Sequence, residues 1–164
     1  MCAAYSLATW KKILWLITSF TIGHSITLFL AANDFIKVDS SITELLIAVT
    51  ILAAAVSNFF VKQDNPINPK PFSFNYLFAG MAGLIHGLGF SGYLRALMGG
   101  EEAIVTPLFA FNIGLELGQI IIVLVFMLIS FIAISIIGVS QRDWRFFFSA
   151  AIAGISLTLI LERL

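Results

Sequence analysis

Charged residues are scarce in this 164-residue chain. Asp, Glu, Lys and Arg together make up 11% of it, against roughly 25% in a soluble domain, and 60% of the residues are hydrophobic. The formal net charge is zero, so no basic face indicates nucleic-acid binding. This composition excludes an ordinary soluble domain. It predicts an integral membrane protein whose first partner is the lipid bilayer and which has no nucleic-acid partner.

Cysteine is nearly absent as well. The single residue of this type, Cys2, excludes an internal disulfide and a cluster of thiolate ligands for a metal. The sequence also lacks a phosphate-binding loop of the GxxxxGK[ST] type, so ATP-driven transport would require a partner. It contains no HExxH pair, which weakens the case for a membrane-embedded metalloenzyme.

Five apolar stretches are long enough to cross a bilayer, which takes about 20 helical residues. They predict an all-α, polytopic transmembrane bundle, and the chain is short enough to form one domain. The expected helices are at residues 13–32, 42–61, 74–97, 104–138 and 146–161. The fourth stretch is about 54 Å long at 1.5 Å per residue, more than a hydrocarbon core of about 30 Å requires. It is therefore expected to be tilted, kinked around Gly114 or Gly118, or extended beyond the membrane.

The lysines before the first stretch could mark a signal peptide. The stretch is longer than the apolar core of a signal peptide, about 7–15 residues, so we interpret it as a spanning helix. The positive charges also predict the orientation. Six lie on one side of the predicted membrane and three on the other: Lys11, Lys12, Lys62, Lys70, Arg142 and Arg145 against Lys37, Arg95 and Arg163. We expect the first side to face the cytoplasm.

Polar residues fall at similar depth in three of the expected helices. His24 and His86 each lie eight residues below the outer end of their helix, or about 12 Å. Asn112 and Glu116 lie about 12 and 18 Å below the same edge on the fourth helix. Asn112, Glu116 and Gln119 have the i, i+4, i+7 spacing of one helical face. A carboxylate at this depth is costly unless it is paired, protonated or bound to a cation.

Neutral imidazole and carboxylate are suitable ligands for divalent nickel, cobalt, zinc or copper. The shared depth of His24, His86 and Glu116 therefore favours a metal-binding layer. The alternative is that each histidine donates to a backbone carbonyl, Ser25 or Thr27 and only holds helices together. Glu44 lies near the outer end of the second helix, where water could solvate it. Glycines flank both histidines, and we expect close helix packing as their main role; they are Gly23, Gly80, Gly83, Gly87, Gly89 and Gly92.

Four features carry a family resemblance: FTIGHSITL at 20–28, the helix opening with Glu44, GLIHGLGF at 83–90 and FNIGLELGQ at 111–119. Together and in this order they resemble the HupE/UreJ family of hydrogenase and urease accessory membrane proteins. The resemblance implies a multi-pass nickel or cobalt permease of the bacterial inner membrane, with the metal as its transported ion and no tightly bound cofactor. It further implies that His24, His86 and Glu116 are the metal or proton-coupling residues, supported by Asn112, Gln119 and Glu44.

One departure from the family pattern concerns the start of the chain. Family members typically have an earlier helix that carries a His and an Asp-His pair, whereas this chain begins MCAAYSLATWKK, directly before the GHS helix. Either an upstream helix is missing from the sequence, which the tail-like segment MCAAYSLAT favours, or this is a shortened member without those ligands.

The leading hypothesis is thus a permease for a divalent transition metal, nickel before cobalt, and not an enzyme. A non-transporting accessory subunit and a membrane-embedded metalloenzyme are the alternatives. Five spans are few for a pore, so we also consider that the protein assembles into a homo-oligomer.

Overall fold

The structure, a computed structural model, describes residues 10–60, 74–98 and 105–163. Within these ranges the chain is helical and has no strand, which confirms the expected all-α bundle. Five of its helices are long and apolar enough to cross a membrane. The helices are α1 (Trp10–Ala32), α2 (Ser40–Ser57), α3 (Phe74–Met98), α4 (Val105–Phe131) and α5 (Gln141–Leu161), with a π-helical segment, η3 (Ile132–Ile136), directly after α4.

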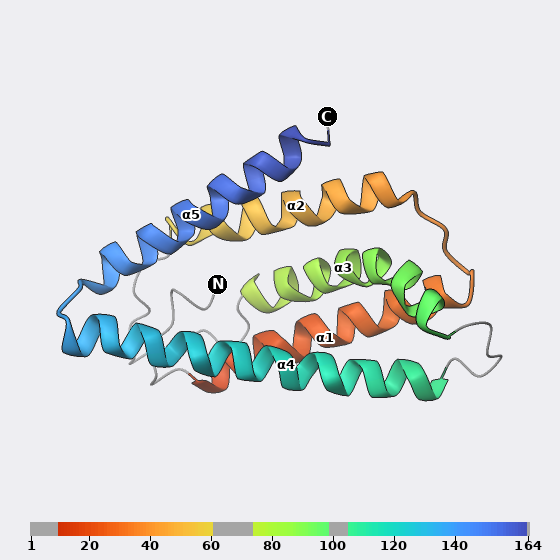
Figure 1. The fold of residues 1–164 in the computed structure, drawn as a ribbon, viewed down its shortest axis with the longest axis horizontal. Helices are drawn as coiled ribbons and strands as arrows, with labels where there is room; N and C mark the ends of the chain where they lie inside the picture. The colour runs from red at the N-terminus through yellow and green to blue at the C-terminus, as the bar shows by residue number, and fades with distance from the viewer. Residues whose placement is uncertain (1–9, 61–73, 99–104, 164) are drawn as a thin grey trace.

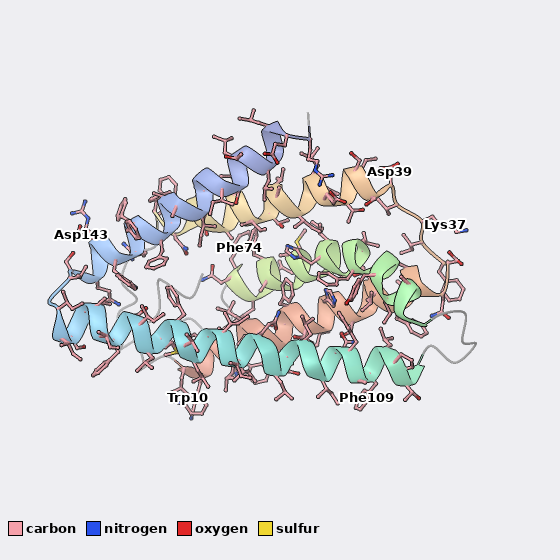
Figure 2. The ribbon with its side chains drawn as sticks, viewed as in Figure 1. Trp10, Lys37, Asp39, Phe74, Phe109 and Asp143 are labelled. Atoms are coloured by element: carbon pink, nitrogen blue, oxygen red, sulfur yellow. The ribbon has the colours of Figure 1, made fainter. Side chains whose placement is uncertain are left out.

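The helices form two groups that share α3. α1 packs against α3 and α4, whereas α2 packs against α3 and α5. Figure 1 shows that α1 and α3 run in the same direction and that α4 runs antiparallel to both. Large apolar side chains such as those of Trp10, Phe74 and Phe109 are more than half exposed. Figure 2 shows Trp10 and Phe109 pointing away from the bundle. The chain is therefore a multi-pass membrane protein, in which lipid covers these side chains.

Glycines set the close approach of α1 and α3. A Cβ added to Gly83 would collide with the backbone carbonyl of Phe20, and one added to Gly23 would collide with the carbonyl of Gly80. A Cβ on Gly87 would collide with the carbonyl of His24. Only glycine lets the two backbones come this close. The expected packing role is confirmed at these positions.

The long fourth helix does not kink at either predicted glycine. Its α-helical hydrogen bonding continues through Gly114 and Gly118, and the ribbon in Figure 1 is unbroken there. The irregular region is η3, followed by Gly138 at φ +84°. Met127 of α4 packs against Ile13 in the first turn of α1. The end of α4 and η3 therefore extend past the start of α1.

The fifth helix begins at Gln141, five residues before the predicted start at 146. Ser140 caps it, since its hydroxyl oxygen accepts a hydrogen bond of 3.1 Å from the backbone N–H of Asp143. Asp143 also places a negative charge at the positive end of the helix dipole. Hydropathy missed this start because Arg142 and Arg145 lie in the first turns of α5.

One further boundary differs from expectation, and part of the orientation argument concerns residues outside the described ranges. α2 ends at Ser57, four residues before the predicted end at 61. Cys2, Lys62, Lys70 and the side chain of Arg95 lie outside the described residues. Lys37 and Asp39 lie at one end of the molecule and Asp143 at the other (Figure 2).

Candidate functional site

His24 lies at the centre of the bundle and is 1% exposed. Three aromatic rings enclose its imidazole. The rings of Phe20 and Phe111 stack on it with centroids 6.0 and 6.2 Å away, and Phe90 presents its edge at 5.6 Å. Within the described part of the chain, neither ring nitrogen has a hydrogen-bond partner. A buried polar group left unpaired costs about 1–3 kcal/mol, so this imidazole requires an explanation other than packing.

His86 lies beside the same aromatic ring. Its imidazole meets Phe20 edge-on at 5.3 Å, and its Nε2 atom is 3.3 Å from the hydroxyl oxygen of Thr50 on α2. Imidazoles from α1 and α3 therefore share Phe20 as a neighbour. Both side chains are held by helices that the glycine contacts fix relative to each other.

Threonine, and not histidine, makes the hydrogen bond between α1 and α3. The Thr27 hydroxyl donates to the carbonyl of Leu84 at 2.6 Å, and the Ser25 hydroxyl donates to the carbonyl of Thr21 in its own helix at 2.7 Å. His24 takes part in neither contact. The alternative that this histidine fastens helices through Ser25 or Thr27 is therefore wrong for the described residues.

The polar face of α4 turns toward α1. The Thr18 hydroxyl donates to Oε1 of Glu116 at 3.3 Å, and the Thr21 hydroxyl donates to Oε1 of Gln119 at 3.3 Å. Asn112 is one turn earlier, and its buried Oδ1 atom has no partner among the described residues. We refer to Thr18, Thr21, Asn112, Glu116 and Gln119 as the α1–α4 seam. Phe111, which precedes Asn112 in the chain, stacks on the imidazole of His24 and so places the seam next to it.

The structure does not join the two histidines and Glu116 into one metal-binding group. No three His, Cys, Asp or Glu side chains come together in the ranges that the structure describes. Glu116 bonds to Thr18, which is six residues from His24 along α1, or about 9 Å. The predicted single layer is thus divided into an imidazole pair, His24 and His86, and an oxygen-rich seam that extends toward the N-terminal end of α1.

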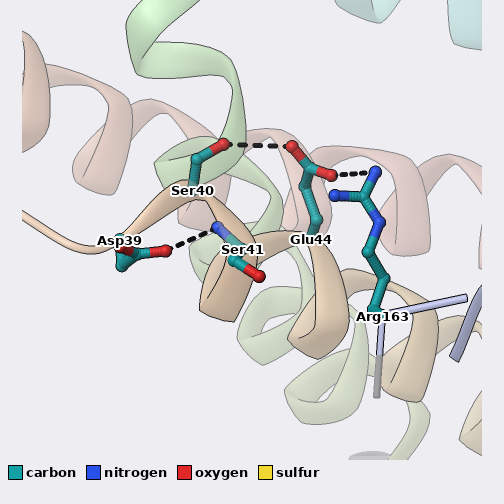
Figure 3. A network of polar contacts seen from close by, with 5 residues as sticks. All are labelled: Asp39, Ser40, Ser41, Glu44 and Arg163. Carbon is teal, nitrogen blue, oxygen red and sulfur yellow. Dashed lines mark hydrogen bonds and ion pairs between the residues drawn. The ribbon is translucent and has the colours of Figure 1, made fainter.

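Glu44 lies apart from the histidines. It lies in α2 one turn after Ser40, where it accepts a hydrogen bond of 3.0 Å from the Ser40 hydroxyl and forms an ion pair with Arg163 beyond the end of α5 (Figure 3). Six residues, about 9 Å of helix, separate it from Thr50, the α2 residue that contacts His86. The ion pair of Glu44 therefore connects α2 to the end of α5.

Two apolar clusters lie on either side of the polar residues along α1. Toward the C-terminal end of α1, Leu28 and Ala32 pack with Leu94 and Leu108. Toward the other end, Ile13 and Ile17 pack with Met127. The imidazole pair and the seam lie between these clusters.

Sequence reasoning missed Thr18, Thr21 and Thr50, and it missed the aromatic enclosure. The spacing of Thr18, Thr21 and His24, three residues at each step, keeps them on one side of α1 and could have indicated a polar stripe. The phenylalanines gave no such signal, because an aromatic side chain in a spanning helix is as compatible with lipid as with a core.

Comparison with known proteins identifies a family for this chain. A family model described as "HupE / UreJ protein" matches residues 2–163, which is nearly the whole chain. No curated protein and no solved structure matches the chain.

Proposed function

The chain belongs to the HupE/UreJ family, accessory membrane proteins connected with nickel or cobalt, and we propose that it is a permease for a divalent transition metal ion. Nickel is the first candidate and cobalt the second. The observation that carries this proposal is His24. Its imidazole is 1% exposed, it lies in a spanning helix, and neither ring nitrogen has a partner among the described residues.

A passing metal ion would use these nitrogen atoms. Neutral imidazole is a good ligand for nickel and cobalt, and His86 offers a second one on the neighbouring helix. Oδ1 of Asn112, which has no partner among the described residues, is an oxygen ligand on a further helix, α4. In the proposed function, His24 and His86 bind the ion, while Asn112, Glu116 and Gln119 provide polar contacts along the seam. Glu44 has no direct part in it.

The two apolar clusters suit such a function. They lie beyond the polar residues toward both ends of α1, so in the proposed function the ion crosses when helices separate at one cluster. Helix movements of this kind around a central site are usual in secondary transporters. α1 contributes to both clusters and to the imidazole pair, so its movement against α4 is the step we assign to transport.

Uptake of radioactive nickel by cells that produce the full chain tests the proposal. We expect His24→Leu and His86→Leu each to lower uptake at least about tenfold at equal protein abundance. Phe90→Leu is the matched control, because it disturbs the same enclosure but leaves both imidazoles in place, and it should retain most of the uptake. Wild-type uptake by both histidine variants would rule the proposal out.

A second candidate is an accessory subunit that transports nothing. The hydrogen bonds from Thr18 and Thr21 to Glu116 and Gln119 favour it, since they use the polar residues of α4 as contacts between helices. Cells that lack the chain separate the two candidates. An accessory subunit would leave nickel uptake unchanged when it is removed, and only the maturation of a nickel enzyme would fall.

A further inference from the structure

The two hydrogen bonds of the α1–α4 seam cross each other. α1 and α4 are antiparallel, so the start of α1 lies at the same end of the bundle as the end of α4. Thr18 is nearer this end than Thr21, and Gln119 is nearer this end than Glu116. Thr18 nevertheless bonds to Glu116, and Thr21 to Gln119. The crossing gathers two hydroxyl oxygens, an amide oxygen and a carboxylate into one small part of the seam.

The distances in this group are long for hydrogen bonds. Each of the two oxygen pairs is separated by 3.3 Å, whereas hydroxyl donors usually lie about 2.7–2.8 Å from an oxygen acceptor. Oxygen ligands that share one hard cation at about 2.3 Å in octahedral geometry lie about 3.3 Å from each other. A separation of 3.3 Å is therefore also the one expected between neighbouring oxygen ligands of such an ion.

The charge of the group selects the ion. Glu116 is the one carboxylate among the four side chains, and in the described ranges no Lys or Arg forms an ion pair with it. A carboxylate inside a membrane needs a compensating positive charge. One monovalent cation makes the site neutral, whereas a divalent ion leaves an excess charge in a region of low dielectric. Oxygen-only ligands also favour a hard ion over a transition metal.

We propose that Thr18, Thr21, Glu116 and Gln119 form a sodium-binding site between α1 and α4, separate from the imidazole pair. Asn112, whose buried Oδ1 has no partner in the described part of the chain, supplies a further oxygen ligand one turn away on the same face of α4. Because the ligands come from two helices, bound sodium holds α1 against α4. Release of the ion frees the same contact that we expect to open during transport. This coupling rests on the proposed function, but sodium binding does not.

Thermal unfolding of the purified full chain in detergent tests sodium binding directly. An ion that binds only the folded protein raises the melting temperature, by roughly 5 °C when the ion concentration is well above the dissociation constant. We expect this rise in sodium chloride relative to choline chloride at equal ionic strength. Thr21→Val, which keeps the side-chain shape, and Glu116→Gln should each weaken the apparent sodium affinity at least about tenfold.

The controls are Thr158→Val and Glu162→Gln, which make the same chemical changes at exposed positions of α5 and its C-cap. Both should respond to sodium like the wild type. Equal melting temperatures in sodium and choline, or an equal loss of response in a control variant, would overturn the sodium site. A response to pH without a response to sodium would also overturn it and assign a proton instead.

Nickel uptake distinguishes this inference from the proposed function. A sodium-dependent melting temperature in a chain that carries no nickel would contradict the permease and leave the sodium site intact. Nickel uptake that is independent of sodium, with no effect of sodium on melting, would contradict the sodium site alone.

Discussion

Thr27 of α1 donates a hydrogen bond of 2.6 Å to the backbone carbonyl of Leu84 in α3, one turn from the unpartnered imidazole of His24. This bond joins two helices that already touch through their glycines. Different residues of α1 therefore have different roles. Threonine and glycine provide the contact with α3, and the histidine is left available for a ligand.

Thr27→Val should therefore destabilise the fold while leaving the imidazoles unchanged. Valine keeps the shape of threonine but cannot donate, so the carbonyl of Leu84 loses its side-chain partner. Hydrogen bonds between membrane helices contribute about 0.6–2 kcal/mol, and we expect a loss in this range. Thermal unfolding in detergent measures it, with Thr158→Val as the control. An unchanged melting temperature would show that this bond contributes nothing.

Gly83→Ala should be more damaging, because its Cβ would meet the backbone carbonyl of Phe20, which cannot rotate away. Overpacking of this kind costs about 1–3 kcal/mol. Gly92→Ala in the same helix is the matched control, since its Cβ would meet no described atom within 4 Å. The control should be neutral or slightly stabilising, as alanine favours helix. Equal stability of the two variants would contradict the close α1–α3 packing.

The Glu44–Arg163 pair should matter little for stability and not at all for metal transport. Its two side chains are 39% and 44% exposed, and exposed ion pairs contribute about 0–1 kcal/mol. Glu44→Gln is therefore expected to keep wild-type nickel uptake and a melting temperature within a few degrees of wild type. A strong loss of uptake in this variant, with normal folding, would return Glu44 to the metal path.

Hydropathy alone was sufficient to predict five spanning helices, since lipid selects long apolar stretches regardless of their partners. It was insufficient at the start of α5, where Ser140 caps a helix whose first turns contain Arg142 and Arg145. Counting residues from the membrane edge likewise predicted a depth for Glu116 but could not predict the direction of its side chain. That direction depends on how α4 is rotated against α1, and it takes the carboxylate to Thr18.

The glycines near the histidines show the same limit. Their clustering indicated close helix packing, which Gly23, Gly83 and Gly87 confirm, but it did not indicate which backbone each one meets. The enclosure of His24 by three phenylalanines depends on the positions of three helices at once. No local pattern in the sequence contains that information.

The most direct test of the permease is the initial rate of nickel entry into liposomes that contain the purified full chain and a trapped metal-sensitive dye. The wild type should admit nickel well above the rate of empty liposomes, and Phe90→Leu should stay close to the wild type. The rate through His24→Leu should be at least about tenfold lower, because this substitution removes the two ring nitrogens and introduces an apolar side chain of similar size. Nickel entry through His24→Leu at the wild-type rate would contradict the account.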